Sequence, residues 1–201
     1  MKKRFLQSVL LVLLALALIP ISAQSPAIDP DLLAKANTGD AAAQVAVGEH
    51  YAADAAAMHN VTQAGEAYKT AAEWYRKAAG QGSVAGQMHL AVLYRDGGKG
   101  FPRDMAQAAV WYRKAAEQGD VTAQASLGVL YSIGQGVPHN DVEAYFWLDL
   151  AASVKGPNQE KYAANRQMIG THITTDQLEE IQDRVAAWIA AHPRPAIAKP
   201  E

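Results

Sequence analysis

Apolar residues recur at helical spacing along most of the chain, and each helical stretch ends at a turn signal. Between residues 134 and 141 the segment GQGVPHND interrupts the spacing, since glycine permits a positive φ after a helix and Pro138 cannot continue one. Apolar helical spacing resumes over 144–151. The pattern therefore predicts a helix–turn–helix unit over about 120–153. The residues of its first apolar stripe are Ala123, Leu127, Leu130 and Tyr131.

The chain contains further copies of this unit. WYRKAAGQG begins at Trp74 and WYRKAAEQG begins at Trp111, a step of 37 residues. VAGQMHLAVLY (84–94) returns as VTAQASLGVLY (121–131) at the same step, and AAAQVAVGEHY (41–51) is an earlier copy. A fixed period of this kind is typical of stacked helix pairs, none of which can bury its apolar stripe alone. We predict an all-α, right-handed α-solenoid in which Trp and Tyr side chains fill the seams between successive units.

The segment after the repeats is predicted to cap the array. TTDQ (174–177) has the spacing of a capping box, and an apolar stripe follows it over 178–189. We expect this helix to cover the apolar side of the last unit, and the alternative is that it binds a partner. The predicted parts are a signal peptide (1–23), a linker with a partial cap (24–39), three repeats (40–82, 83–119 and 120–153), capping helices (154–192) and a flexible tail (193–201).

The first residues have the three parts of a secretory signal peptide. Basic residues at positions 2–4 precede an apolar run from Val9 to Ile19, and small residues end near Ala23. The run is shorter than the roughly 20 apolar residues that a transmembrane helix needs, so cleavage is favoured over a retained anchor. We expect a periplasmic protein with no stable membrane anchor after cleavage, and secretion is the alternative location.

Composition narrows the chemistry that the chain can perform. The net charge of −2 becomes −5 when the three basic residues of the signal are removed, and no basic run remains, so nucleic acid is not an expected partner. Cysteine is absent, which excludes disulfides, thiolate metal sites and a cysteine nucleophile. The histidines lack metal-site spacing, and no GxSxG, SxxK or phosphate-binding glycine loop occurs. We therefore predict no catalytic residues, no metal and no cofactor.

The pieces WYRKAAEQGD (111–120), AQASLGVLY (123–131) and GQGV (134–137) resemble the Sel-one-like (Sel1-like) repeat, a relative of the tetratricopeptide repeat. The resemblance covers about 41–153, and its motifs are specific for the fold but not for an activity. It implies a scaffold for protein–protein interaction. Some exported relatives are pinned by disulfides and have been linked to β-lactam binding or hydrolysis, and this chain lacks those cysteines.

The first unit departs from the repeat pattern. It carries ADAAAMHNVTQAGEAYKT (53–70) in place of a GxGV turn, so its Tyr51-to-Trp74 step is 23 residues against 17 from Tyr94 to Trp111. GGKGF (97–101) in the second unit is also one residue longer than its counterpart. Insertions in solenoids commonly form loops on one face. We therefore predict a loop at 53–70. This loop either binds a partner or is simply a longer turn, and the two alternatives are equally favoured.

Positions that differ between units are the candidate contacts for a partner, because the repeated positions build the frame. On the first helix of each unit they follow i, i+1, i+4 and i+7, which is one helix face. By analogy of fold, that face lines the concave side and suits an extended peptide or a partner helix; a merely solvated face is the equal alternative. The candidate partner-binding residues are Glu49, Met88, His89, Val92, Arg95, Ser126, Val129 and Ser132.

These features together favour a non-catalytic scaffold or adaptor in the bacterial envelope. It is expected to be a monomer that binds a peptide or helix of an envelope protein. A cell-wall or β-lactam binding or hydrolysing protein, and a secreted effector, are the alternative functions.

Overall fold

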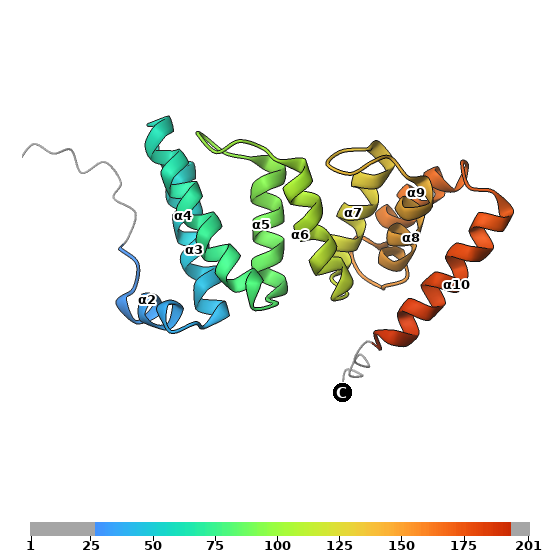
Figure 1. Ribbon diagram of the computed structural model, residues 1–201, viewed down its shortest axis with the longest axis horizontal. Coiled ribbons are helices and arrows are strands. Elements are labelled where there is room, and N and C mark those ends of the chain that lie inside the picture. The colour runs from blue at the N-terminus through green and yellow to red at the C-terminus, as the bar shows by residue number, and fades with distance from the viewer. Residues whose placement is uncertain (1–26, 194–201) are drawn as a thin grey trace, which may run out of the picture.

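The computed structural model describes residues 27–193. The predicted signal peptide (1–23) and residues 194–201 of the predicted tail lie outside this range. Within it the fold is an all-α solenoid, as the repeat period predicts (Figure 1). The helices are α2 (Pro30–Asn37), α3 (Ala41–Ala57), α4 (Val61–Gly80), α5 (Val84–Asp96), α6 (Met105–Glu117), α7 (Val121–Ile133), α8 (Asp141–Ala152), α9 (Gln159–Gly170) and α10 (Thr175–Ala191).

Helices α3–α4, α5–α6 and α7–α8 form three antiparallel pairs that stand side by side in a row (Figure 1). The first helix of each pair begins after a short polar side chain, because that side chain caps the open end of the helix. Asp40 accepts from the backbone N–H of Ala43 at 2.8 Å, and Asp120 accepts from that of Ala123 at 2.7 Å. Ser83 plays the same part at the start of α5.

The repeated tryptophans lie in the seams. Trp74 on α4 is 9% exposed and packs with Ala36 of α2 and Val47 of α3. Trp111 on α6 is half-buried and packs against the apolar clusters on both sides of it, one shared with α4 and one with α7 and α8. The recurrence of these side chains therefore follows from repeated packing between neighbouring units, as predicted.

A buried glutamine joins each first helix to the helix before it. Gln44, Gln87 and Gln124 are at most 4% exposed. Each side-chain amide donates to a backbone carbonyl eight residues earlier, and the acceptors for Gln87 and Gln124 are Ala79 and Ala116. A buried polar side chain is stable only when its amide is hydrogen-bonded. The glutamines therefore fix the position of each pair on the preceding one.

Two glycines lie where the paired helices are in close contact. A Cβ added to Gly48 would lie 2.5 Å from Cε1 of Tyr75, and one added to Gly128 would lie 2.8 Å from Cγ of Leu148. These distances confirm that no side chain fits there. In the second unit the buried residue at this point is Ala91, the next smallest choice.

The structure contradicts the prediction of a loop at 53–70. The added residues lengthen α3 to 17 residues and α4 to 20, and only Met58–Asn60 connect them. This stretch is rich in alanine, a strong helix former, so extending both helices costs less than forming a long loop. The longer turn of the second unit packs onto this extension: Phe101 is buried against Tyr68, and Lys99 Nζ donates to the carbonyl of Met58 at 2.9 Å.

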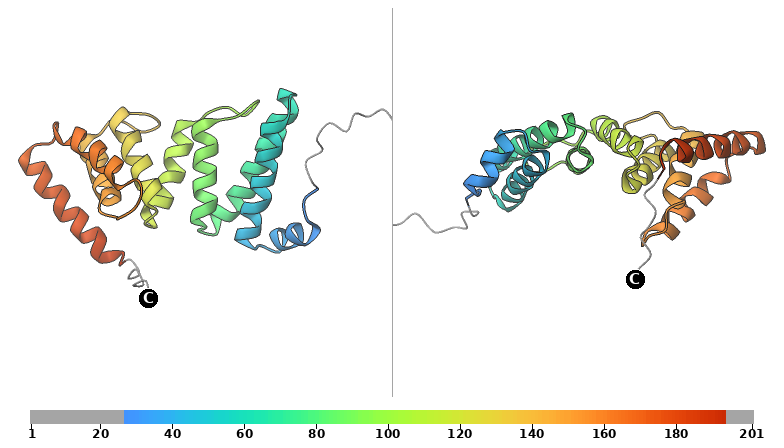
Figure 2. Two further views of the ribbon diagram at one scale, coloured as in Figure 1. Left: turned by 180° about the vertical axis from the view of Figure 1, so that it is seen from behind. Right: turned by 90° about the horizontal axis from the view of Figure 1, so that it is seen from below.

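After the third pair, α9 continues the row and α10 leaves it. The half-buried Gln159 amide donates to the Ala152 carbonyl at 3.1 Å, seven residues earlier, which resembles the links that Gln44, Gln87 and Gln124 make to the preceding helix. Helix α10 starts with the predicted capping box between Thr174 and Gln177. It packs on α8 rather than on α9, and the two last helices lie apart (Figure 2).

Candidate functional site

The surface made by the first helices α3, α5 and α7 and by α9 carries a hollow near the C-terminal end of the row. Helices α3 and α5 contact each other, and so do α7 and α9. We call this surface the first-helix face. A hollow of about 340 Å³ opens on it between α7 and α9, and the C-terminal end of α5 closes one side. Arg95, Ser126 and Val129, three of the predicted contact residues, line this hollow.

Arg95 is held in a fixed position at the wall of the hollow. Its Nε and Nη2 donate to the two carboxylate oxygens of Asp96 at 2.6 and 2.7 Å, and its Nη1 donates to the hydroxyl of Tyr112 at 3.0 Å. An arginine carries five N–H donors, and these bonds occupy three, so two remain available. Hydrogen bonding to Asp96 raises the pKa of Arg95 above its ordinary value, and the same contact lowers the pKa of Asp96.

Tyr112 accepts one of the hydrogen bonds that hold Arg95 in place. Its side chain comes from α6 and is fully buried. Burial raises the pKa of Tyr112, because a phenolate would be poorly solvated there, and the nearby charge of Arg95 works in the opposite direction. The hydroxyl therefore stays protonated near neutral pH and accepts the hydrogen bond from Arg95.

Helix α9 supplies the opposite wall. Asn158, Lys161 and Asn165 lie on one side of this helix and line the hollow. Their side chains make no hydrogen bond or ion pair with any residue in 27–193. Asn158 is the N-cap residue of α9, yet its side chain does not cap the helix. The hollow thus has three polar groups whose hydrogen-bonding capacity is left for solvent or a ligand.

The floor of the hollow is apolar. Ala125, Leu130 and Tyr162 are buried there, and Val129 is half-buried. An apolar floor with a few oriented polar groups on its rim is typical of a binding site. The lining residues include Arg95 and Lys161 but no carboxylate, and Asp96 lines the adjoining hollow instead.

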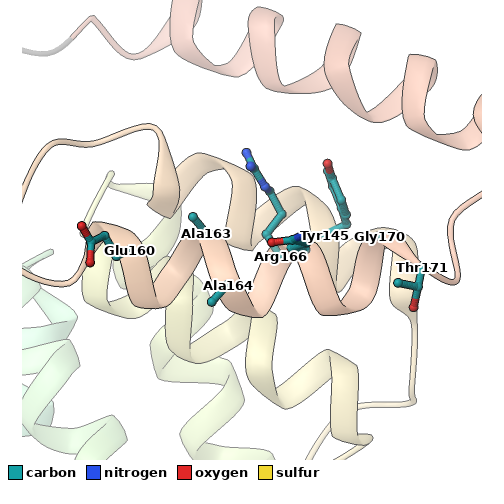
Figure 3. A pocket seen from close by; sticks show the side chains of 8 residues that line it. Tyr145, Glu160, Ala163, Ala164, Arg166, Gly170 and Thr171 are labelled. Atoms are coloured by element: carbon teal, nitrogen blue, oxygen red, sulfur yellow. The ribbon is translucent and has the colours of Figure 1, made fainter.

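Two further hollows flank this one. The first shares Arg95, Val129 and Leu130 with it and extends toward Met105 and Ile133. The second, of about 600 Å³, lies on the other side of α9, where the side chains of Tyr145 and Arg166 point to the same side (Figure 3). Arg166 already forms an ion pair with Asp149 at 2.5 Å, so its charge is satisfied within the fold. The second hollow is therefore the weaker candidate.

The structure separates the remaining predicted residues from this hollow. Glu49 and His89 form a pair of their own between α3 and α5, with Oε1 and Nε2 3.0 Å apart. Met88 and Val92 are half-buried and pack against the core. The remaining predicted residue is Ser132, whose hydroxyl donates to the Val129 carbonyl of its own helix at 2.9 Å.

Sequence reasoning missed Tyr112 and the residues of α9. A sequence signal for α9 was the recurrence of a glutamine, because Gln159 follows Gln124 by 35 residues, close to the repeat period. Counting two residues on from each glutamine pairs Ser126 with Lys161. Treating α9 as a fourth first helix would therefore have added Lys161 to the candidate contacts.

The part of the chain that the structure describes contains no group of three or more His, Cys, Asp or Glu side chains placed to hold a metal ion. None of the helices in that part is both long and apolar enough to cross a bilayer.

Family comparison matches three successive segments to the Sel1 repeat: 41–83, 84–120 and 121–153. The chain belongs to the Sel1 repeat family. Sel1 repeats are generally modules for protein–protein interaction, and their fold is typically a non-catalytic scaffold. The family thus accounts for the helix pairs and the seams, whereas α9 and α10 lie beyond the matched segments.

Two solved structures share this fold with the chain. One is a protective antigen present in uropathogenic Escherichia coli strains that displays an SLR fold, with 29% identity and a TM-score of 0.64, covering 90% of this chain and 40% of that one. The other is a Sel1 repeat protein from Oxalobacter formigenes, with 28% identity and a TM-score of 0.57, covering 82% of this chain and 60% of that one. The Sel1 chain therefore spans less than two thirds of either structure. None of the curated proteins compared with the chain matches it.

Proposed function

We propose that this Sel1 repeat protein is a non-catalytic adaptor of the bacterial envelope that binds an extended segment of a partner protein on its first-helix face. The observation that carries the proposal is the hollow between α7 and α9, which combines a buried apolar floor with polar side chains that no residue of the fold satisfies. Groups of this kind gain hydrogen bonds when a ligand binds, and they cost little when water covers them.

The features of this face favour a role in binding a partner and argue against a role as a simple spacer between other proteins. A spacer needs only a polar surface, whereas Val129 on this face is half-buried beside the hollow and Arg95 is fixed by two partners. Pre-oriented side chains lower the entropy that a ligand loses on binding. The location in the envelope rests on the signal-like segment at 1–23.

Photocrosslinking in intact cells tests the proposal. A photoreactive amino acid replaces Val129, which borders the hollow, in the full chain. The matched control replaces Val110, a valine that is 46% exposed on the second helix of the preceding pair. We expect a discrete crosslinked protein from position 129 and none from position 110. Equal products from both positions, or none from position 129, would contradict the proposal.

Fractionation of the same cells tests the location. The periplasmic fraction should contain the crosslinked product. Recovery of the protein only from the cytoplasm would contradict the envelope assignment and leave the test of the binding face unchanged.

A further inference from the structure

The charges around the hollow point to the chemistry of its ligand. The protein as a whole is acidic, with a net charge of −2, yet the side chains that line this hollow carry positive charge from Arg95 and Lys161 and no negative charge. Asp96 lines the adjoining hollow and neutralises much of the charge of Arg95 through two hydrogen bonds, so the ammonium group of Lys161 is the main uncompensated charge of this hollow. A hollow of this charge on an acidic protein favours an anionic ligand.

The available hydrogen-bond donors match a carboxylate. Two N–H groups of Arg95 remain after its bonds to Asp96 and Tyr112, and the Lys161 ammonium group and the amides of Asn158 and Asn165 add donors from the opposite wall. A carboxylate accepts several hydrogen bonds at once, and bonds between charged groups are the strongest that a surface site makes. The donors stand on two elements, so one bound carboxylate would bridge α5 and α9.

The shape of the surface distinguishes a side chain from a chain terminus. The hollow that extends toward Met105 and Ile133 shares Arg95, Val129 and Leu130 with the main one, so the two adjoin at Arg95. A peptide that ended at Arg95 would leave one of the two hollows empty. A segment that passes Arg95 would fill both, with an acidic side chain toward Lys161 and an apolar one near Ile133, which is 54% exposed.

We infer that the hollow between α7 and α9 binds an aspartate or glutamate side chain within an extended segment of the partner protein. Arg95 and Lys161 hold the carboxylate from opposite walls, and the segment continues over Ile133. This inference rests on the proposed function, because it specifies the ligand of the same face.

Two pools of fluorescent peptides test the inference. Each peptide has about nine residues, since an extended chain advances about 3.3 Å per residue and must cover both hollows. The central residue is glutamate in one pool and glutamine in the other, the flanking residues are randomised, and both ends are blocked. We expect the intact protein to retain the glutamate pool about 10-fold more strongly, as a charge-assisted hydrogen bond implies.

The variants Lys161→Glu and Lys155→Glu separate a local effect from a general one. Both replace an exposed lysine and change the net charge equally, but Lys155 does not line the hollow. Lys161→Glu should remove the preference for glutamate, and Lys155→Glu should keep it. Circular dichroism of each variant shows whether the fold is intact.

The outcomes separate the inference from the proposed function. Equal retention of both pools, an effect of Lys155→Glu as large as that of Lys161→Glu, or no retention of either pool would overturn the carboxylate inference. A specific crosslink at position 129 would still support the adaptor function in each of those cases. Loss of that crosslink together with retained glutamate preference would instead overturn the proposed function.

Discussion

The side-chain amide of Gln118 donates a hydrogen bond of 2.8 Å to Oε1 of Gln87, and this bond ties the end of α6 to the start of α5. Gln81 and Gln44 make the same bond at 2.8 Å in the unit before. The third unit lacks a glutamine at the end of α8, and Oε1 of Gln124 is buried there without a hydrogen-bond partner. The repeated glutamine therefore has a paired side-chain oxygen in the first two units and an unpaired one in the third.

This difference predicts unequal effects of the same substitution. Gln87→Leu removes a well-formed hydrogen bond and should lower the free energy of unfolding by ~1 kcal/mol. Gln124→Leu removes an oxygen that is already unpaired together with the amide bond to the Ala116 carbonyl; these effects oppose each other, so the loss of stability should be smaller than in Gln87→Leu. Urea unfolding followed by circular dichroism measures both. A greater loss of stability in Gln124→Leu than in Gln87→Leu would show that the unpaired oxygen is satisfied in solution.

The glycines make a second comparison. A Cβ at Gly128 would lie 3.0 Å from the carbonyl oxygen of Ala144 as well as near Leu148, whereas a Cβ at Gly80 would meet nothing within 4 Å. Gly128→Ala should destabilise the protein by ~1–3 kcal/mol, because the paired helices must move apart. Gly80→Ala should stabilise it by about 0.5–1 kcal/mol, since alanine is the better helix former. Thermal unfolding of the two variants should shift in opposite directions.

The sequence predicted the parts of the fold that repeat. Trp74 and Trp111 fill equivalent seams, so identical packing left an identical sequence signal. The insertion at 53–70 was mispredicted because it has no second copy for comparison, and the tendency of solenoid insertions to form loops was given more weight than its alanines, which favour a helix.

The junction between α8 and α9 was not recognised in the sequence, because different residue types join these two helices. Arg76 donates to the hydroxyl of Tyr94 at 2.9 Å, and Arg113 contacts Tyr131 in the same way one unit later. At the next junction an ion pair between Asp149 and Arg166 joins α8 to α9 instead. The spatial relationship is kept while the residue types differ, so self-similarity did not reveal α9 as a fourth first helix. The site residues on α9 were missed for the same reason.

The pairing of Arg95 with Asp96 predicts a dependence of stability on pH. The contact lowers the pKa of Asp96 in the folded protein below its unfolded value of about 4. Its contribution is therefore complete above about pH 4 and is lost as the pH falls through the lower, folded pKa. The effect should be small, because both side chains are partly exposed. Asp96→Asn should lose less stability than the unaltered protein between about pH 5 and pH 2 in urea unfolding.

The contact of Lys99 with the end of α3 predicts where the extended pair α3–α4 begins to unfold locally. Lys99 Nζ donates to the carbonyls of Ala56 at 3.3 Å and Met58 at 2.9 Å, so it satisfies backbone acceptors at the end of α3 and places a positive charge where the helix dipole favours one. Lys99→Met keeps an unbranched side chain and removes the ammonium group that makes this contact. It should cost about 0.3–1 kcal/mol.

Hydrogen exchange should report that loss locally, because opening of the turn exposes the end of α3 before the seams are disturbed. Amides in 55–58 and 97–101 should exchange faster in Lys99→Met, while those of α7 and α8 should not change. Lys155→Met is the matched control, since Lys155 is exposed and forms no hydrogen bond or ion pair with any residue in 27–193. Unchanged exchange in both segments would mean that the end of α3 is stable without the Lys99 contact, and that the packing of Phe101 is enough to hold the GGKGF segment.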